Sequence, residues 1–97
     1  MITINNNKWV IESELTLKTV SQLYKTYKKE QSKLGNIWII DFSKCKKIDS
    51  SGLSLIIEYI KCAKKYNIQL KLENIDQKTL SLAKVHGANT ILEEYMI

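Results

Sequence analysis

The chain has 97 residues, a net charge of +5, a hydrophobic share of 44% and a charged share of 26%. This length supports one domain with a single core, and the balance of residue types is that of a soluble globular protein. Every basic residue is a lysine. Because arginine is the preferred residue for bidentate contacts to phosphate and guanine, a nucleic-acid-binding function is not expected.

The opening segment, Met1 to Lys8, is polar and contains three successive asparagines. It has neither the apolar stretch of a signal peptide nor the pattern of a transit segment. No apolar run elsewhere approaches the ~20 residues that a membrane-spanning helix needs. We therefore expect a cytoplasmic protein that does not insert into a membrane directly.

The first part of the chain predicts two strands joined by an asparagine turn, followed by a helix. Asparagine tolerates positive φ, which favours a tight hairpin, and Thr16 is a candidate N-cap for the helix, with Gly35 as its stop. The predicted ranges are Ile2 to Asn5 and Trp9 to Glu14 for the strands, and Leu17 to Leu34 for the helix.

The second part predicts a strand, a helix, another strand and two short helices. The run Ile37 to Phe42 is apolar throughout, as in a strand covered on both faces, whereas Ile68 to Glu73 alternates. A helix runs between them to about Tyr66. Asp76 is expected to cap a helix that ends near His86 and Gly87, and Thr90 to cap a last short one. This order predicts an α/β fold with a mixed sheet and right-handed crossovers.

The start of the long helix is the most informative stretch. Asp49, Ser50 and Ser51 carry short oxygen-bearing side chains that can accept hydrogen bonds from the free N–H groups of a first helical turn. Gly52 lets another backbone approach closely. A helix start also concentrates unpaired donors and the positive end of the macrodipole. The four residues are therefore either a helix cap alone or a cap that also presents hydroxyl groups to a partner.

The same helix carries two apolar lines at helical spacing. Leu53 begins the core stripe, which continues through Ile56, Ile57, Ile60 and Ala63. The second line is Leu55, Tyr59, Cys62 and Tyr66. Either neighbouring helices cover this second line, or it is an exposed protein-binding surface, since aromatic residues are enriched in interface cores.

At this point the sequence resembles the STAS domain family. The central motif is the apolar strand ending in Asp41-Phe42-Ser43, a short loop, and Ile48-Asp49-Ser50-Ser51-Gly52-Leu53 before an apolar helix. The segments around it are similar too: Trp9 to Ile11 with Ser13-Glu14-Leu15-Thr16, and Leu72 to Ile75 with the closing stretch Leu80 to Leu92. Ser13 stands where the family usually has glycine.

The resemblance implies a single STAS domain over residues 1–97, with a four- to five-stranded mixed sheet and helices mainly on one side. It is closest to the small cytoplasmic STAS subunit of the ABC transporter that maintains outer-membrane lipid asymmetry. The implied partner is the ATPase subunit and, through it, the membrane permease, which would place the protein at the inner membrane. The expected partner-binding residues are Asp49, Ser50, Ser51, Gly52, Leu53, Leu55 and Tyr59. Ser50 occupies the position of a contact hydroxyl, often threonine, in that subclass.

The alternative implied by the same family is an anti-sigma factor antagonist. In such a switch an anti-sigma factor kinase phosphorylates the serine before the glycine, which is Ser51 here. A phosphate adds about −1.5 to −2 charges and can release a partner by repulsion. Thr16 departs from this subclass, which usually has aspartate there.

Catalysis is not expected. His86, the single histidine, precedes Gly87 at a predicted helix end, where a helix C-terminal role is favoured over acid-base chemistry. Cys45 and Cys62 form neither a metal-ligand set nor a disulfide framework, and reduced thiols fit a chain without an export signal. No phosphate loop, nucleophile elbow or metal-ligand spacing is present. We therefore predict a binding module with no cofactor and no metal.

Overall fold

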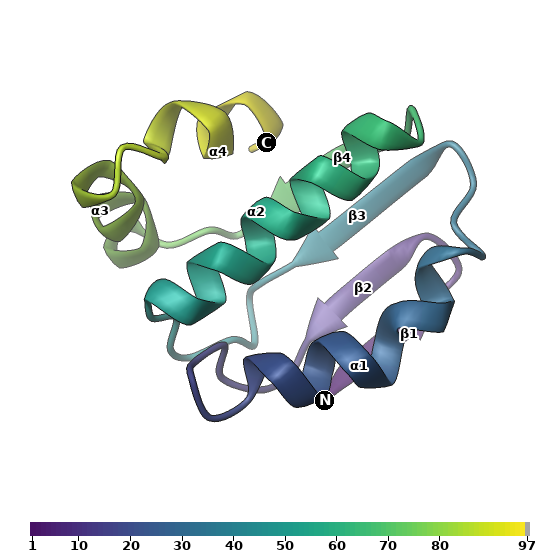
Figure 1. The fold of residues 1–97 in the computed structure, drawn as a ribbon, viewed down its shortest axis with the longest axis horizontal. Coiled ribbons are helices and arrows are strands. Elements are labelled where there is room, and N and C mark those ends of the chain that lie inside the picture. The colour runs from purple at the N-terminus through teal and green to yellow at the C-terminus, as the bar shows by residue number, and fades with distance from the viewer. Residues whose placement is uncertain (97) are drawn as a thin grey trace.

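The computed structural model describes residues 1–96, which form four strands and four helices (Figure 1). The strands lie in the order β1-β2-β3-β4; β1 is antiparallel to β2, and β2, β3 and β4 are parallel. The elements are β1 (Ile2–Asn5), β2 (Lys8–Ile11), α1 (Val20–Gln31), β3 (Ile37–Asp41), α2 (Ser50–Lys65), β4 (Gln69–Glu73), α3 (Gln77–Val85) and α4 (Asn89–Tyr95).

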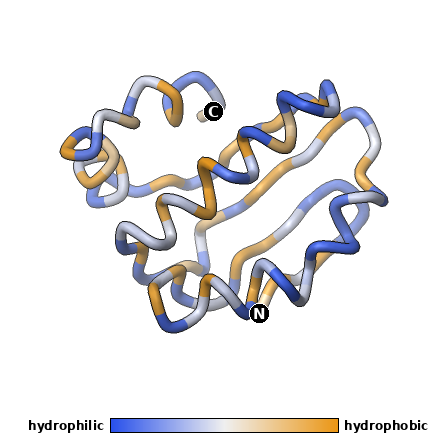
Figure 2. Tube along the Cα trace, in the orientation of Figure 1, coloured by the Kyte–Doolittle hydropathy of each residue, from blue (hydrophilic) through white to orange (hydrophobic). Residues whose placement is uncertain are grey.

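The core lies between one face of the sheet and the helices. α1 and α2 cross this face, and α3 and α4 lie beside α2 near β4 (Figure 1). Alternation along β2 turns Trp9 and Ile11 into the core and leaves Lys8 exposed on the other face. Figure 2 shows the largely apolar β3 alongside α2, in which apolar and polar residues alternate around the helix.

The predicted fold class is confirmed: an α/β domain built on a mixed four-stranded sheet. In place of a fifth strand, Met96 forms a single isolated parallel bridge with Leu72 of β4. Within residues 1–96, no helix combines the length and apolar character that a bilayer crossing requires.

The predicted bounds differ most around the first helix. β2 ends at Ile11, three residues earlier than predicted. α1 begins only at Val20, because residues 16 to 19 form a turn in which the N–H groups of Thr19 and Val20 both donate to the Thr16 carbonyl. The prediction that Thr16 caps the helix is wrong. Its hydroxyl donates to Glu14 instead, over 3.0 Å, and Leu17, which was predicted to be the first residue of the helix, is 79% exposed in this turn.

The two closing helices give one confirmation and one correction. Asp76 caps α3 by accepting from the N–H of Thr79 over 2.8 Å, and Gly87 ends the helix at φ +70°. Thr90 does not cap α4: that helix begins at Asn89, and its N-cap, Ala88, has no side-chain hydrogen bond.

A close backbone contact requires glycine at position 52. The segment before α1 runs against the start of α2, where Leu15 and Ile48 form a parallel bridge. The Leu15 N–H donates to the Lys47 carbonyl over 2.8 Å, and the Asp49 N–H donates to the Leu15 carbonyl over 3.1 Å. A Cβ on Gly52 would collide with the Leu15 carbonyl oxygen. Only glycine fits here without a backbone shift.

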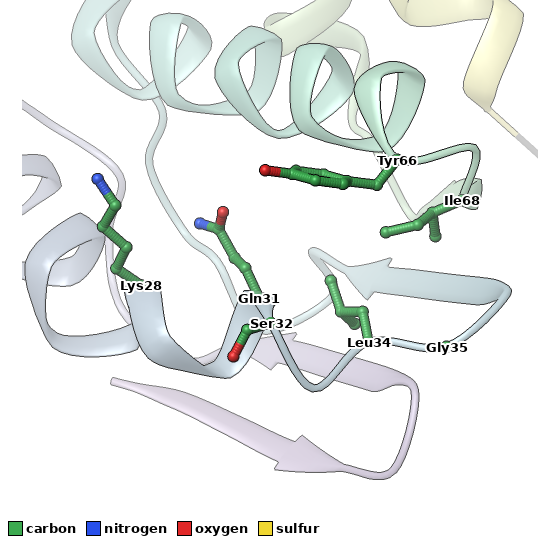
Figure 3. A pocket seen from close by; sticks show the side chains of 7 residues that line it. All are labelled: Lys28, Gln31, Ser32, Leu34, Gly35, Tyr66 and Ile68. Carbon is green, nitrogen blue, oxygen red and sulfur yellow. The ribbon is translucent and has the colours of Figure 1, made fainter.

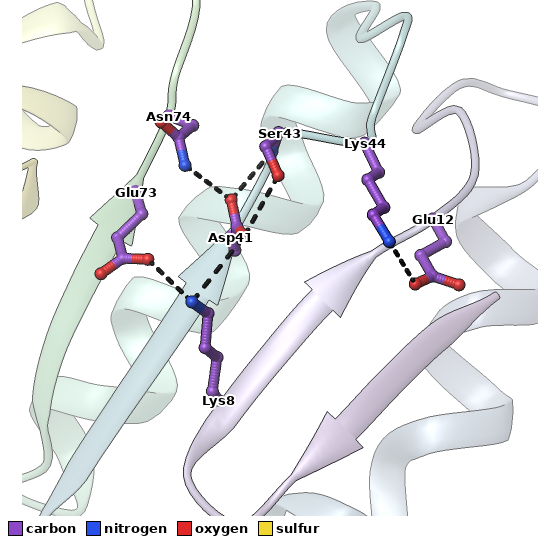
Figure 4. A network of polar contacts seen from close by, with 7 residues as sticks. All are labelled: Lys8, Glu12, Asp41, Ser43, Lys44, Glu73 and Asn74. Carbon is purple, nitrogen blue, oxygen red and sulfur yellow. Dashed lines mark hydrogen bonds and ion pairs between the residues drawn. The ribbon is translucent and has the colours of Figure 1, made fainter.

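A polar network occupies the carboxyl ends of β3 and β4 (Figure 4). Asp41 accepts hydrogen bonds from Asn74 Nδ2 over 2.8 Å and from the Ser43 N–H and hydroxyl over 2.9 and 3.1 Å. Lys8 Nζ lies 4.0 Å from Asp41 and 3.5 Å from Glu73. Burial alone would raise the pKa of the Asp41 carboxyl, but these hydrogen bonds and the Lys8 charge outweigh it and hold the pKa below its usual value.

Replacing Gly52 by alanine is expected to lower the free energy of unfolding by about 1–3 kcal/mol, the usual cost of overpacking. Urea denaturation measures this change. Gly35→Ala is the matched control, because a Cβ at Gly35 meets no atom within 4 Å. Equal stability of the two variants would contradict the proposed contact with Leu15.

Asp41→Asn is expected to lower the free energy of unfolding by about 1.5–3 kcal/mol at pH 7, the range for hydrogen bonds to a charged group. Because the folded pKa of Asp41 is depressed, its contribution is present above the unfolded pKa of about 3.9 and is lost as pH falls through the folded pKa. The difference between wild type and variant should therefore shrink between pH 5 and pH 2, as urea unfolding at each pH would show.

Glu12→Gln provides the control, because Glu12 pairs with the exposed Lys44 at 3.5 Å. An exposed pair of this kind contributes only about 0–1 kcal/mol. A loss in Asp41→Asn that stays constant down to pH 2 would contradict the ionic origin of the effect.

Candidate partner-binding surface

The candidate surface is built on the first turn of α2. Asp49 is the N-cap: one carboxylate oxygen accepts from the N–H groups of Ser51 and Gly52, over 2.9 and 3.1 Å. The other accepts from the N–H of Leu17 over 3.0 Å. The hydrogen bond from the Leu17 N–H, with those from Gly52 and Ser51, holds the pKa of Asp49 below its ordinary value, although burial acts to raise it. Asp49 therefore stays ionised at neutral pH and joins the loop before α1 to the first turn of α2.

The loop before α1 is stiffened by its own hydrogen bonds. The Thr19 hydroxyl donates to the Glu14 carbonyl over 2.7 Å and accepts from the Thr16 N–H over 3.0 Å. The Lys18 N–H in turn donates to the Thr16 hydroxyl over 3.3 Å. This turn, the Asp49 carboxylate and Gly52 together hold the start of α2 in one position.

The two serines after Asp49 differ in their surroundings. Ser50 is exposed, and its hydroxyl lies 3.2 Å from Nε2 of His86. Ser51 is half-buried and sits directly before Gly52. The Ser54 hydroxyl donates to the Ser50 carbonyl over 3.1 Å, one turn further along the helix. The surface thus presents one hydroxyl that is oriented by an imidazole.

His86 occupies the place that the sequence predicted, the C-cap of α3, where its N–H donates to carbonyls of the last turn. Its contact with Ser50 was not predicted. The two residues lie 36 positions apart, and nothing in the spacing indicates that the end of α3 meets the start of α2. His86 therefore joins the candidate surface.

Four of the expected partner-binding residues are buried. Leu55 and Tyr59 are 3% and 2% exposed, and Leu53 and Gly52 are buried as well. Of the second apolar line only Tyr66 is well exposed, at 63%, and Cys62 is half-buried. Tyr59 packs against Trp9 and Trp38 of the sheet, and Cys62 Sγ lies 3.4 Å from Gln31 of α1, so the sheet and α1 together cover most of the line. The exposed part of the candidate surface is therefore Ser50, the partly exposed Ser51 and Asp49, and His86.

Tyr59 belongs to an aromatic cluster in the core. Its ring centroid lies 5.9 Å from that of Trp9 and 5.1 Å from that of Trp38, and the two tryptophans are 5.0 Å apart, all edge to face. Within residues 1–96, the Tyr59 hydroxyl and Trp38 Nε1 have no hydrogen-bond partner. Burial raises the pKa of Tyr59 far above its usual value, so the phenol stays neutral.

The cysteines offer little nucleophilic chemistry. Both are free and half-buried, and burial is the main cause that raises the pKa of each thiol. Little thiolate is therefore present at neutral pH. Among the described residues, no group of three histidine, cysteine or acidic side chains is placed to hold a metal ion.

Comparison with known proteins places this geometry in a family. A family model described as "Mlab, STAS domain" matches residues 6–94. No curated protein matches the chain.

Two solved structures share the fold. A sulfate transporter family protein from Wolinella succinogenes is 15% identical, with a TM-score of 0.73 over 93% of this chain and 74% of that one. The anti-sigma factor antagonist SpoIIAA in its unphosphorylated form is 17% identical, with a TM-score of 0.73 over 100% of this chain and 84% of that one. Since the family model covers nearly the whole chain and the fold agrees, this protein belongs to the STAS domain family.

Proposed function

We propose that this protein is a non-catalytic STAS subunit that binds the ATPase of an ABC-type phospholipid transporter and regulates or stabilises it. The observation that carries the proposal is the exposed Ser50 hydroxyl, held by His86 at the rigid start of α2. It stands at the position where the resembling transporter subunits have a contact hydroxyl. The matching family model, described as an Mlab STAS domain, supports the same subclass.

The mechanism is differential binding. A subunit without its own chemistry can change the activity of an ATPase only by binding one conformation or assembly state more tightly than another. A surface that is already ordered loses little conformational freedom on binding. The hydrogen bonds that fix the start of α2 therefore favour a partner contact made there. Through the ATPase, the protein would lie at the cytoplasmic side of the inner membrane, next to the permease.

The second candidate is an anti-sigma factor antagonist switched by a kinase. Two observations favour it: Ser51 precedes Gly52, and the fold agrees with SpoIIAA over the whole chain. A phosphate on Ser51 would sit at the positive end of the helix dipole, which tolerates the charge, and would repel an acidic partner. Thr16 argues against this candidate, because antagonists usually have aspartate at that position.

Ser50→Glu is expected to cut recovery of the ATPase about tenfold, which corresponds to about 1.4 kcal/mol of lost binding free energy. The variant should fold normally, because an acidic residue in the first turn is favourable to a helix. Affinity purification of the tagged protein from its own host, followed by mass spectrometry of the bound proteins, measures the effect.

Ser81→Glu is the matched control, since Ser81 is exposed on α3. Equal recovery of the ATPase with both variants would show that Ser50 is not in the contact. Recovery of an anti-sigma factor kinase, or an added phosphate on Ser51 by intact mass, would decide for the switch instead.

A further inference from the structure

A groove runs along the seam between α1 and α2. Three adjoining hollows of about 390, 290 and 420 Å³ form it. The first two share Tyr24 and Glu58, and the last two share Lys28, Gln31 and Tyr66. From Ser54 to Tyr66 the groove follows twelve helical steps, or about 18 Å. We call it the α1–α2 groove.

The two ends of the α1–α2 groove differ in chemistry. Near the start of α2 its lining is largely apolar, with Val20, Tyr24 and Leu55. Toward the end of α2 it is lined by Lys28, Lys61 and Lys65. In the last hollow the Tyr66 ring faces Gln31 and Leu34, with Lys28 at the rim (Figure 3).

The lysines of the α1–α2 groove are not neutralised within the chain. Among the described residues, none of the three has a carboxylate within 4.0 Å. Lys28 and Lys65 instead lie over the rings of Tyr24 and Tyr66, at 5.1 and 5.4 Å from the ring centroids. Glu58 is the one acid that lines these hollows within residues 1–96, which leaves an excess of two positive charges.

The helix dipole explains only part of this arrangement. Lysines in the last turn of α1 and of α2 offset the negative ends of the two dipoles. That effect requires lysines near the helix ends, but it does not require them to face a common hollow. Lys28 and Lys65 from these two last turns nevertheless line the same groove, together with Lys61 from earlier in α2.

We propose that the α1–α2 groove binds an acidic amphipathic segment of a partner protein. Apolar side chains of the segment would pack near Val20 and Leu55, and its carboxylates would meet Lys28, Lys61 and Lys65. A segment of about twelve residues in a helix, or about six when extended, matches the 18 Å length. A flat membrane surface would contact the ends of the lysine side chains but would not fill the apolar part of the groove at Val20 and Leu55.

This surface is separate from the one proposed for the transporter contact. The α1–α2 groove begins at Ser54, one turn after Ser50, and runs toward the opposite end of α2. The inference therefore stands whether Ser50 contacts an ATPase, a kinase or neither.

The test uses a defined probe: a fluorescein-labelled dodecapeptide with leucines on one helical face and glutamates on the other. Fluorescence anisotropy measures its affinity for the full chain, and amide chemical shifts in NMR spectra locate the contact. We expect shifts concentrated at residues that line the groove. Combining Lys28→Glu, Lys61→Glu and Lys65→Glu should weaken binding about tenfold or more, the cumulative effect of three charge contacts.

The matched control combines Lys46→Glu, Lys78→Glu and Lys84→Glu, which gives the same change in net charge at exposed lysines outside the groove. We expect this variant to bind within about twofold of wild type at physiological salt, where distant charges are screened. If both triple variants lose the same amount of peptide affinity, the effect comes from net charge alone and the proposal is wrong.

Three other results would overturn the proposal. They are equal affinity for a peptide with glutamine in place of glutamate, no binding of the glutamate peptide at millimolar concentration, and tighter binding to phosphatidylglycerol vesicles than to the peptide. The last would identify the face as a membrane contact. Ser50→Ala removes the hydroxyl of the proposed transporter contact without adding a charge near the groove, so it should leave the peptide affinity within about twofold of wild type and keep this test separate from that of the proposed function.

Discussion

The Asp49 carboxylate is the interaction on which the rest of the surface depends. It accepts from three backbone N–H groups, of which two belong to α2 and one to the loop before α1. Gly52 makes this possible, because only without a Cβ can the loop carbonyl of Leu15 pass so close to the helix. A helix start that is tied to a second segment cannot fray independently, so the capping interaction fixes tertiary structure as well as the local turn.

The same close packing limits what the protein can offer to a partner. The core between the sheet and the helices buries Leu53, Leu55 and Tyr59. These side chains therefore pack below the surface and are not available to a partner. Hydroxyl and imidazole groups at Ser50, Ser51 and His86 are left at the proposed contact. Recognition there depends on hydrogen-bond geometry and shape more than on apolar burial, and such contacts are sensitive to a single added charge.

Some local signals in the sequence were reliable, whereas the caps predicted at Thr16 and Thr90 and the covering of one helix face by another element were not. The caps at Asp49 and Asp76 and the stop at Gly87 follow from side chains and backbone preferences within one turn. Helical spacing identified the line from Leu55 to Tyr66 but left two alternatives, because periodicity gives the residues that share a face and not the element that covers them. Likewise, Thr16 has the side chain of a cap, yet it bonds to Glu14 because the loop is held against α2.

α2 consequently carries the two proposed contact surfaces at its two ends, and these ends differ in chemistry. At its N-terminal end, Asp49 accepts from the backbone donors of the first turn and hydroxyl groups lie beside it, whereas lysines lie near aromatic rings at its C-terminal end. The helix dipole accounts for the sign of charge favoured at each end. A single rigid helix between them keeps the two surfaces at a fixed separation, so a partner large enough to touch both would gain the second contact with little further loss of freedom.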